Sequence, residues 1–186
     1  MILRKLLNFI AQFAGDIKQQ FRNIYLNSNF YDKKISKINN EELIYKPSPH
    51  LLSSLIKYQT QKINVDSISE ENLWENENIN NDNFKRLNNF YWFFTLDLKS
   101  SRKKTQKIVS DWITKNHKYN SRSWEFDLTS KRIIAWLSNH SLTLEQADKD
   151  YLEIFNGMIQ KQTNHLIGEI NNSKNTNNKI IGCAAI

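Results

Sequence analysis

The sequence predicts an all-α fold. Glycine and proline are scarce, since the 186 residues contain four glycines and two prolines, whereas β-sandwiches and barrels need such residues for their tight turns. Apolar residues recur at helical spacing through most of the chain, without strand-like alternation. Consecutive helices with short connections favour antiparallel helix hairpins. Periodicity alone does not decide whether such hairpins stack into a solenoid or close into an α/α toroid.

Residues 1–27 predict an amphipathic helix. The apolar positions are 3, 6, 7, 10, 13, 14, 17, 21, 24 and 25, which is helical spacing. Asn8 and Gln12 interrupt the apolar run, so the segment is a weak match to a signal peptide. Such a helix packs on the fold or lies on a membrane surface. No segment of the sequence is long and apolar enough to span a bilayer.

Residues 28–82 are expected to form an irregular segment. They are polar and rich in Asn, and "KPSPH" at 46–50 is a clear break. The short run "KINVDSI" is compatible with extended structure. Because so long a loop is unusual inside a compact domain, we expect it to wrap around the surface. Trp74 would anchor it by docking in a pocket.

Residues 83–186 are predicted to be one helical domain. The first helix covers "NFKRLNNFYWFFTLDL", and apolar residues on so many sides predict burial among other helices. The second covers "SRKKTQKIVSDWITKNH", and the third begins near Asp127 or Thr129, which suit an N-cap. The longest begins at Thr143, which forms a capping-box pattern with Gln146. A last apolar helix begins in "KIIGCAAI", where Cys183 is expected to be buried.

The composition narrows the function classes. The net charge of +7 suits nucleic acid, an anionic membrane surface or an acidic polysaccharide, and equally a solvated surface rich in Lys. The lysines are dispersed, so nucleic-acid binding is disfavoured. One cysteine excludes an internal disulfide framework and a Cys-based zinc site. The four histidines have no metal-ligand spacing and are expected at the surface or at helix caps, and no phosphate-binding or nucleophile motif occurs.

The tryptophans raise the question of sugar binding. Sugars stack their apolar faces on aromatic rings, while Arg and Asn bond to hydroxyls and carboxylates. Trp92, Trp112 and Trp136 fall on predicted helices and are expected in the core. Trp124 lies in a predicted loop among charged residues. It is therefore a candidate either for the core or for a sugar-stacking position.

Five segments in order resemble the N-terminal domain of the heparinase II/III-like polysaccharide lyases. They are "FKRLNNFYWFFTLDL", "VSDWITKN", "SWEFDLTSKRIIAWL", "HLIGEINN" and "NNKIIGCAAI". The resemblance covers about residues 70–186 and depends on the order and spacing of the segments. It implies part of an incomplete α/α toroid, followed in full-length members by a β-sandwich, in a bacterial cell-envelope or periplasmic protein. Because the chain stops inside an apolar helix, we expect it to be an N-terminal fragment.

The resemblance also implies a reaction, β-elimination on an acidic, uronate-containing polysaccharide. A group neutralises the substrate carboxylate, a base removes the C5 proton, and an acid protonates the leaving oxygen. No cofactor or metal is required, and no nucleic acid is expected as a partner. Asn177 resembles the carboxylate-neutralising asparagine, although the family often has Asn-His where this chain has Asn177-Asn178. The family's catalytic tyrosine and second histidine would follow Ile186, so we expect this chain alone to be inactive.

Arg132 resembles the family's helix arginine that faces the central groove. Its other interpretation is a salt bridge to Glu125 or Asp127. Two further functions remain open, a non-catalytic helical protein that binds glycans at the cell envelope and a helical-repeat interaction module. The sequence does not decide the particular polysaccharide, the oligomeric state, or export against a cytoplasmic location.

Overall fold

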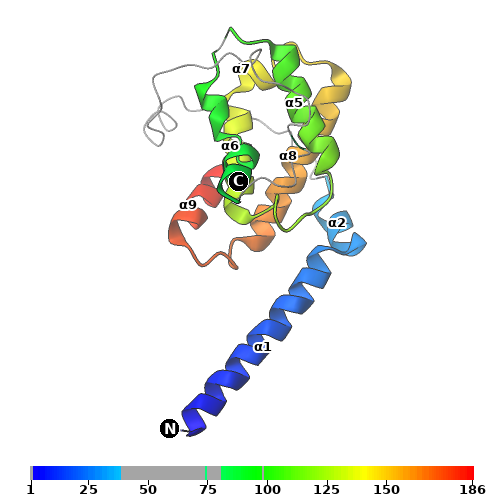
Figure 1. The fold of residues 1–186 in the computed structure, drawn as a ribbon. Coiled ribbons are helices and arrows are strands. Elements are labelled where there is room, and N and C mark those ends of the chain that lie inside the picture. The colour runs from blue at the N-terminus through cyan, green and yellow to red at the C-terminus, as the bar shows by residue number, and fades with distance from the viewer. Residues whose placement is uncertain (1, 39–73, 75–80, 98) are drawn as a thin grey trace.

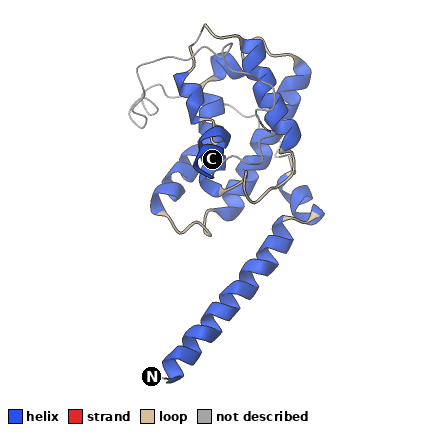
Figure 2. Ribbon diagram, in the orientation of Figure 1, coloured by secondary structure: helices blue, strands red, loops and turns tan. Residues whose placement is uncertain are grey.

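The computed structural model describes residues 2–38, 74, 81–97 and 99–186, with side chains described from residue 9. Figure 2 shows helices joined by turns and loops, and the described ranges contain no β-strand. The all-α prediction is therefore confirmed. In chain order the elements are α1 (Ile2–Leu26), α2 (Asn29–Ile35), α4 (Asn81–Asn88), the 3-10 helix η2 (Tyr91–Thr95), α5 (Arg102–Lys115), α6 (Phe126–Ser138), α7 (His140–Thr143), α8 (Lys149–Glu169) and α9 (Thr176–Ala185).

The elements from α4 to α9 pack into one unit, which we call the helical body. Within it α8 contacts both α5 and α6, α7 contacts α5 and α6, and α9 packs along α6. The short helix α2 joins this unit by packing on α8. In contrast, α1 projects away from the helical body as a single long helix (Figure 1). Among the described residues α1 is the longest helix, with 25 residues against 21 in α8. The prediction that the helix beginning at Thr143 is the longest is therefore wrong.

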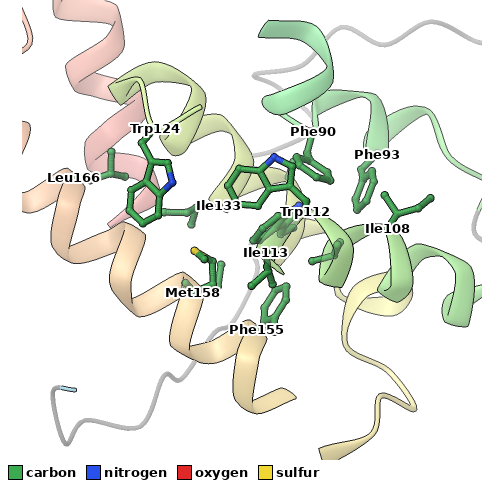
Figure 3. Packing of buried hydrophobic residues seen from close by; sticks show 14 of the residues in the cluster. Phe90, Phe93, Ile108, Trp112, Ile113, Trp124, Ile133, Phe155, Met158 and Leu166 are labelled. Atoms are coloured by element: carbon green, nitrogen blue, oxygen red, sulfur yellow. The ribbon is translucent and has the colours of Figure 1, made fainter. Parts of the chain in front are cut away.

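The core of the helical body combines aromatic rings with aliphatic side chains (Figure 3). Phe90 lies edge-to-face against Trp136, with ring centroids 5.1 Å apart, and Trp112 lies 5.5 Å from Trp136 in the same manner. These three side chains are fully buried, and such ring pairs add to the free energy gained by burying their area. The prediction that Trp112 and Trp136 belong to the core is confirmed. Trp92 packs on the same cluster but is only half-buried.

The prediction of one continuous helix from residue 83 to residue 98 is wrong. The helix α4 ends at Asn88, and Phe90 adopts the left-handed conformation with φ 57° before η2 begins. The side chain of Asn89 accepts a hydrogen bond from the Tyr91 backbone N–H, which stabilises this turn. Left-handed backbone is costly for a bulky residue, and here it lets the Phe90 ring enter the core.

Among its described residues, the N-terminal third differs from its prediction at α2 and at the start of α4. The helix predicted over residues 1–27 is confirmed as α1. The segment predicted to be irregular contains α2, whose N-cap Ser28 accepts a hydrogen bond from Tyr31 N, and α4 begins at its end. Trp74 stacks on Phe90 at 5.4 Å, as expected of an anchor. The rest of the expected wrapping segment, residues 39–73 and 75–80, lies outside the described residues.

One helix boundary and one burial prediction are corrected near the C-terminal end. Thr143 is not an N-cap, because its hydroxyl donates to the Trp136 carbonyl at 2.8 Å. The helix α8 begins after Asp148, whose carboxylate accepts from Tyr151 N. Cys183 is exposed rather than buried. Its neighbour Gly182, a buried residue of α9, lies so close to α6 that a Cβ would clash with the Phe126 ring.

Candidate functional site

Arg132 is the centre of a polar network inside the helical body. It lies in the middle of α6 and is fully buried. Its Nη1 donates to the backbone carbonyls of Asn88 at 2.9 Å and Ser123 at 3.1 Å. Its Nε donates to Gln162 Oε1 and its Nη2 to Thr129 Oγ1, both at 3.2 Å. One side chain therefore ties α4, the turn before α6, and α8 together.

The charge of Arg132 is balanced by dipoles and an aromatic ring. Its guanidinium lies over the Trp112 ring, 4.0 Å from the ring centroid, which is a favourable cation–π geometry. Among the described residues no ion pair includes Arg132. The predicted pairing with Glu125 or Asp127 is wrong, because Glu125 pairs with Lys85 and Asp127 with Lys131. Burial lowers the pKa of the Arg132 guanidinium well below its ordinary value.

Trp124 is also buried. It ends the turn that precedes α6, is 1% exposed, and donates its indole N–H to the Asn116 carbonyl at 3.1 Å. The ring lies edge-on to His165 of α8, with centroids 5.5 Å apart. Its position in a loop had made Trp124 a candidate either for the core or for sugar stacking. In the structure its ring is enclosed by other protein side chains. That Trp124 contacts a glycan stays a prediction, and it would require the surrounding packing to open.

Next to Trp124 lies a buried pair of residue types that often transfer protons. Tyr31 of α2 and His165 of α8 are 3% and 2% exposed, and Tyr31 Oη lies 2.7 Å from His165 Nδ1. His165 Nε2 lies 3.1 Å from the Trp124 carbonyl. A carbonyl only accepts, so Nε2 carries the proton and Tyr31 donates to Nδ1. The pair therefore holds α2 against α8 and against the turn at Trp124.

The protonation of this pair follows from its burial. Burial lowers the pKa of His165 to about 4, opposed by the hydrogen bond to the Trp124 carbonyl and assisted by the nearby charge of Arg132. Burial, with smaller contributions from Tyr119 and Tyr25, raises the pKa of the Tyr31 hydroxyl. A tyrosine that acts as a base needs the opposite shift. In this conformation the pair is neutral, closed to solvent and structural.

Asn177 is placed very differently. It lies in the first turn of α9 and its side chain is exposed. The turn is capped by Asn175, whose side chain accepts from Asn178 N at 3.2 Å. Among the described residues, no hydrogen bond or ring contact joins Asn177 to Trp124 or Arg132. The structure thus brings two of the three predicted residues into one buried network and leaves the third at the surface.

The sequence reasoning missed several members of the buried network, namely Tyr31, Asn88, Gln162 and His165. His165 was expected at the surface or as a cap, and that expectation is wrong. A signal was present, because Phe155, Met158, Gln162 and His165 recur every three or four residues along α8, all on its buried face. A histidine on such a stripe is a core residue that needs partners. Asn88 and Tyr31 carried no comparable signal, because their contacts depend on tertiary packing.

The arrangement limits the chemistry available. Among residues 2–38, 74, 81–97 and 99–186, no three His, Cys, Asp or Glu side chains are grouped so as to hold a metal ion. The Arg132 donors, which could bind an anion, are bonded within the protein, while Gln162 Nε2 is a buried donor without a hydrogen-bond partner among the described residues. The exposed candidate is the first turn of α9, which carries Asn177. No protein-family model, curated protein or solved structure matches this chain.

Proposed function

We propose that the chain is the N-terminal helical region of a heparinase II/III-like lyase, and that it binds acidic, uronate-containing polysaccharide. The ordered segments from "FKRLNNFYWFFTLDL" to "NNKIIGCAAI" support the proposal. The helices α5 and α6 each pack on α8, and α9 packs on α6, and helix-on-helix packing is what a wall of an α/α toroid requires. That these helices form part of an α/α toroid is part of the proposal.

The observation that carries the proposal is the exposed position of Asn177 at the start of α9. Backbone N–H groups of a first helical turn are unpaired within the helix, and the helix dipole favours an anion there. The side-chain amide of Asn177 adds a donor to that end. Residues 170–186 contain no Asp or Glu, while Lys174 and Lys179 lie close to Asn177 in sequence. This end of α9 therefore suits the carboxylate of a uronate.

In the proposed reaction Asn177 binds the substrate carboxylate and withdraws charge from it. A proton beside a carboxylate is very weakly acidic, so hydrogen bonds that strengthen as the dianion develops lower the barrier. The resemblance assigns the base and the acid to a tyrosine and a histidine that follow residue 186 in the family. Neither Tyr31 nor His165 replaces them, since both are buried and bonded to each other. We expect residues 1–186 to bind polymer without cleaving it.

The test is retention on immobilised alginate, with immobilised dextran as the neutral reference. Asn177→Asp puts a negative charge where the substrate carboxylate would lie, and should weaken binding about tenfold. Asn156→Asp, at an exposed position of α8, makes the same chemical change away from the site and should leave binding within about twofold. An acidic residue also favours a first helical turn, so lost binding would not reflect lost folding. Equal retention of the two variants would refute the role of Asn177.

A second experiment tests the lyase itself. A chain continued through the downstream coding sequence should release products that absorb in the ultraviolet band of an unsaturated uronate. If no uronate polymer gives this signal while alginate is still retained, the non-catalytic glycan-binding alternative replaces the lyase. A downstream sequence of further helix pairs without a β-sandwich would instead favour the interaction module.

One observation favours non-catalytic binding of an acidic polymer as the second candidate. Lys161 of α8 bonds to Asp32 of α2 and to the His117 carbonyl, so α2 and the 116–123 loop lie on either side of it. Exposed lysines occur on these two segments and directly beside them, namely Lys33 and Lys34 of α2, Lys37 after it, Lys115 at the end of α5 and Lys118 of the loop. If the double variant Lys33→Gln, Lys118→Gln lowers alginate retention while Asn177→Asp does not, the polymer binds through this basic region. Such binding would not involve the proposed lyase residue Asn177.

A further inference from the structure

The N-terminal helix exposes a continuous apolar face. Between residues 9 and 24 the exposed large apolar side chains are Phe9, Ile10, Phe13, Ile17, Phe21 and Ile24. Phe9, Phe13 and Phe21 are 67%, 59% and 69% exposed, and Phe9 stacks on Phe13 at 6.4 Å. Their spacing of three or four residues places them on one side of α1. Phe30 of α2, also exposed, packs against Tyr25 and continues the face.

Little of this helix is held by the helical body. Among the described residues, α1 contacts the rest of the protein near its last turns, through buried Leu26 and an ion pair between Arg22 and Glu169 of α8. Figure 1 shows the rest of α1 extending away from the other helices. A helix in water gains most of its stability from packing its apolar face. The apolar face of α1 therefore calls for an occupant outside the described residues.

The width of the face argues against a two-stranded coiled coil as that occupant. Ile10, Ile17 and Ile24 recur every seven residues with Phe13 between them, which resembles a seam. However, Gln20 occupies the next seam position, and the flanking positions hold Phe9 and Phe21. Coiled coils usually have charged residues at those flanks. A broad apolar face with aromatic residues instead matches a helix that lies in a lipid interface.

The charge of α1 complements an anionic surface. Its sequence contains four basic residues, Arg4, Lys5, Lys18 and Arg22, and one acidic residue, Asp16. Lys18 is exposed and lies in the polar part of the helix. Basic residues near an anionic bilayer add to the affinity that apolar burial provides. No helix among the described residues is long and apolar enough to cross a membrane.

We propose that α1 lies in the interface of an anionic lipid bilayer, parallel to its plane. Phe9, Phe13, Ile17 and Phe21 enter the boundary between headgroups and acyl chains, while Lys18 faces the lipid headgroups. At 25 residues, α1 covers roughly 37 Å of the surface, and it holds the helical body beside the membrane through α2. This proposal does not depend on the proposed polysaccharide or on Asn177.

The test is flotation of the full chain with vesicles. Phosphatidylcholine vesicles containing an equal part of phosphatidylglycerol should carry the protein, and pure phosphatidylcholine vesicles should carry much less. Binding should weaken as salt is raised, because the charge contribution is screened. In Phe13→Trp, with the native tryptophans left unchanged, the new tryptophan should add a blue-shifted fluorescence component that brominated lipids quench. The helical signal should rise on binding, since the bilayer covers the apolar face.

Matched variants separate the apolar face from the polar side of the same helix. Phe13→Ser should weaken vesicle binding about tenfold, because the buried area of one aromatic side chain is lost. Gln12→Ser changes the neighbouring exposed position on the polar side and should bind like the unchanged protein. Lys18→Gln should reduce binding to anionic vesicles about fivefold and leave binding to neutral vesicles unchanged.

Two results would overturn the proposal. One is vesicle binding that Phe13→Ser and Gln12→Ser reduce equally, because the apolar face would then not be the contact. The other is a lack of flotation together with a dimer in sedimentation equilibrium that Phe13→Ser dissociates, which would assign the face to a second copy. Loss of alginate retention in Asn177→Asp would not affect either result, so the two proposals fail separately.

Discussion

The helical body and α1 use apolar residues in opposite ways. In the helical body Trp112, Trp124 and Trp136 are enclosed, and the indole N–H groups of Trp112 and Trp124 donate to Asn88 and Asn116. In α1 the phenylalanines face solvent, and the helix touches the rest of the protein near its last turns. The helical body encloses its own apolar side chains, whereas the apolar face of α1 would be covered only by a partner. A substitution should therefore affect stability in the first region and association in the second.

The largest expected effect is at Arg132. Arg132→Leu leaves two carbonyls, an amide oxygen and a hydroxyl without their donor inside the core, and should lower the free energy of unfolding by about 3–5 kcal/mol. Arg86→Leu, at an exposed position of α4, should change it by less than about 0.5 kcal/mol. Urea unfolding followed by tryptophan fluorescence measures both. Similar small changes would mean that the network does not hold the body together.

The second effect depends on pH. His165 has a pKa of about 4 in the folded chain, and its ordinary value is 6.5. Between these values the unfolded chain binds a proton that the folded chain does not, so stability falls as the pH is lowered from about 6.5 to 4. The fall should amount to about 3 kcal/mol. Above pH 6.5 this contribution is fully present and constant.

A pair of variants isolates this contribution. His165→Asn should be less stable at neutral pH, because Tyr31 and the Trp124 carbonyl lose their partner, and should lack this part of the decline with acid. His117→Asn, at an exposed position, should retain the decline. Unfolding curves at pH 7 and pH 5 provide the comparison. An unchanged decline in His165→Asn would mean that other groups cause it.

A smaller effect is expected where α9 meets α6. In Gly182→Ala the new Cβ would lie 2.7 Å from Cε1 of the Phe126 ring, and moving that ring should cost about 1–2 kcal/mol. In Gly157→Ala nothing lies within 4 Å of the new Cβ, so the helix interior should gain about 0.5–1 kcal/mol. Thermal unfolding should therefore shift in opposite directions. Stabilisation by both changes would show that α9 packs less closely than described.

The smallest effect is expected from the exposed face of α1. Phe13→Ser should leave the free energy of unfolding of the helical body within about 0.5 kcal/mol of its original value, since the Phe13 ring is exposed and stacks on Phe9 of the same helix. Urea unfolding in the absence of lipid measures it. A loss of several kcal/mol would mean that α1 folds back on the body in solution.

Local patterns predicted much of this fold. Apolar spacing located α1, α5, α6, α8 and α9, because the apolar residues on one face of a helix recur every three or four positions in its sequence. The break at Phe90 was missed, since a left-handed Phe is favoured only by the tertiary cluster that its ring enters. The boundary at Lys149 was missed because Thr143 and Gln146 mimic a capping box, although Gln146 is itself left-handed.

The site residues also differ in how much of their environment the sequence could predict. The sequence singled out Arg132 and Trp124, yet a sequence does not show whether a polar side chain on a helix faces a groove or a closed core. Their partners come from positions as distant in the chain as Asn88 and Gln162. Asn177 was proposed only through the family resemblance, because in so Asn-rich a segment its own position carries no signal.

Amide hydrogen exchange with and without anionic vesicles tests the comparison between the two regions most directly. Without vesicles, amides between Phe9 and Phe21 should exchange much faster than those of α6 and α8, because their helix is not covered by packing. With phosphatidylglycerol-containing vesicles, exchange in α1 should slow strongly while α6 and α8 remain unchanged. Protection of α1 equal to that of α8 before lipid is added, or no change on adding it, would contradict the account.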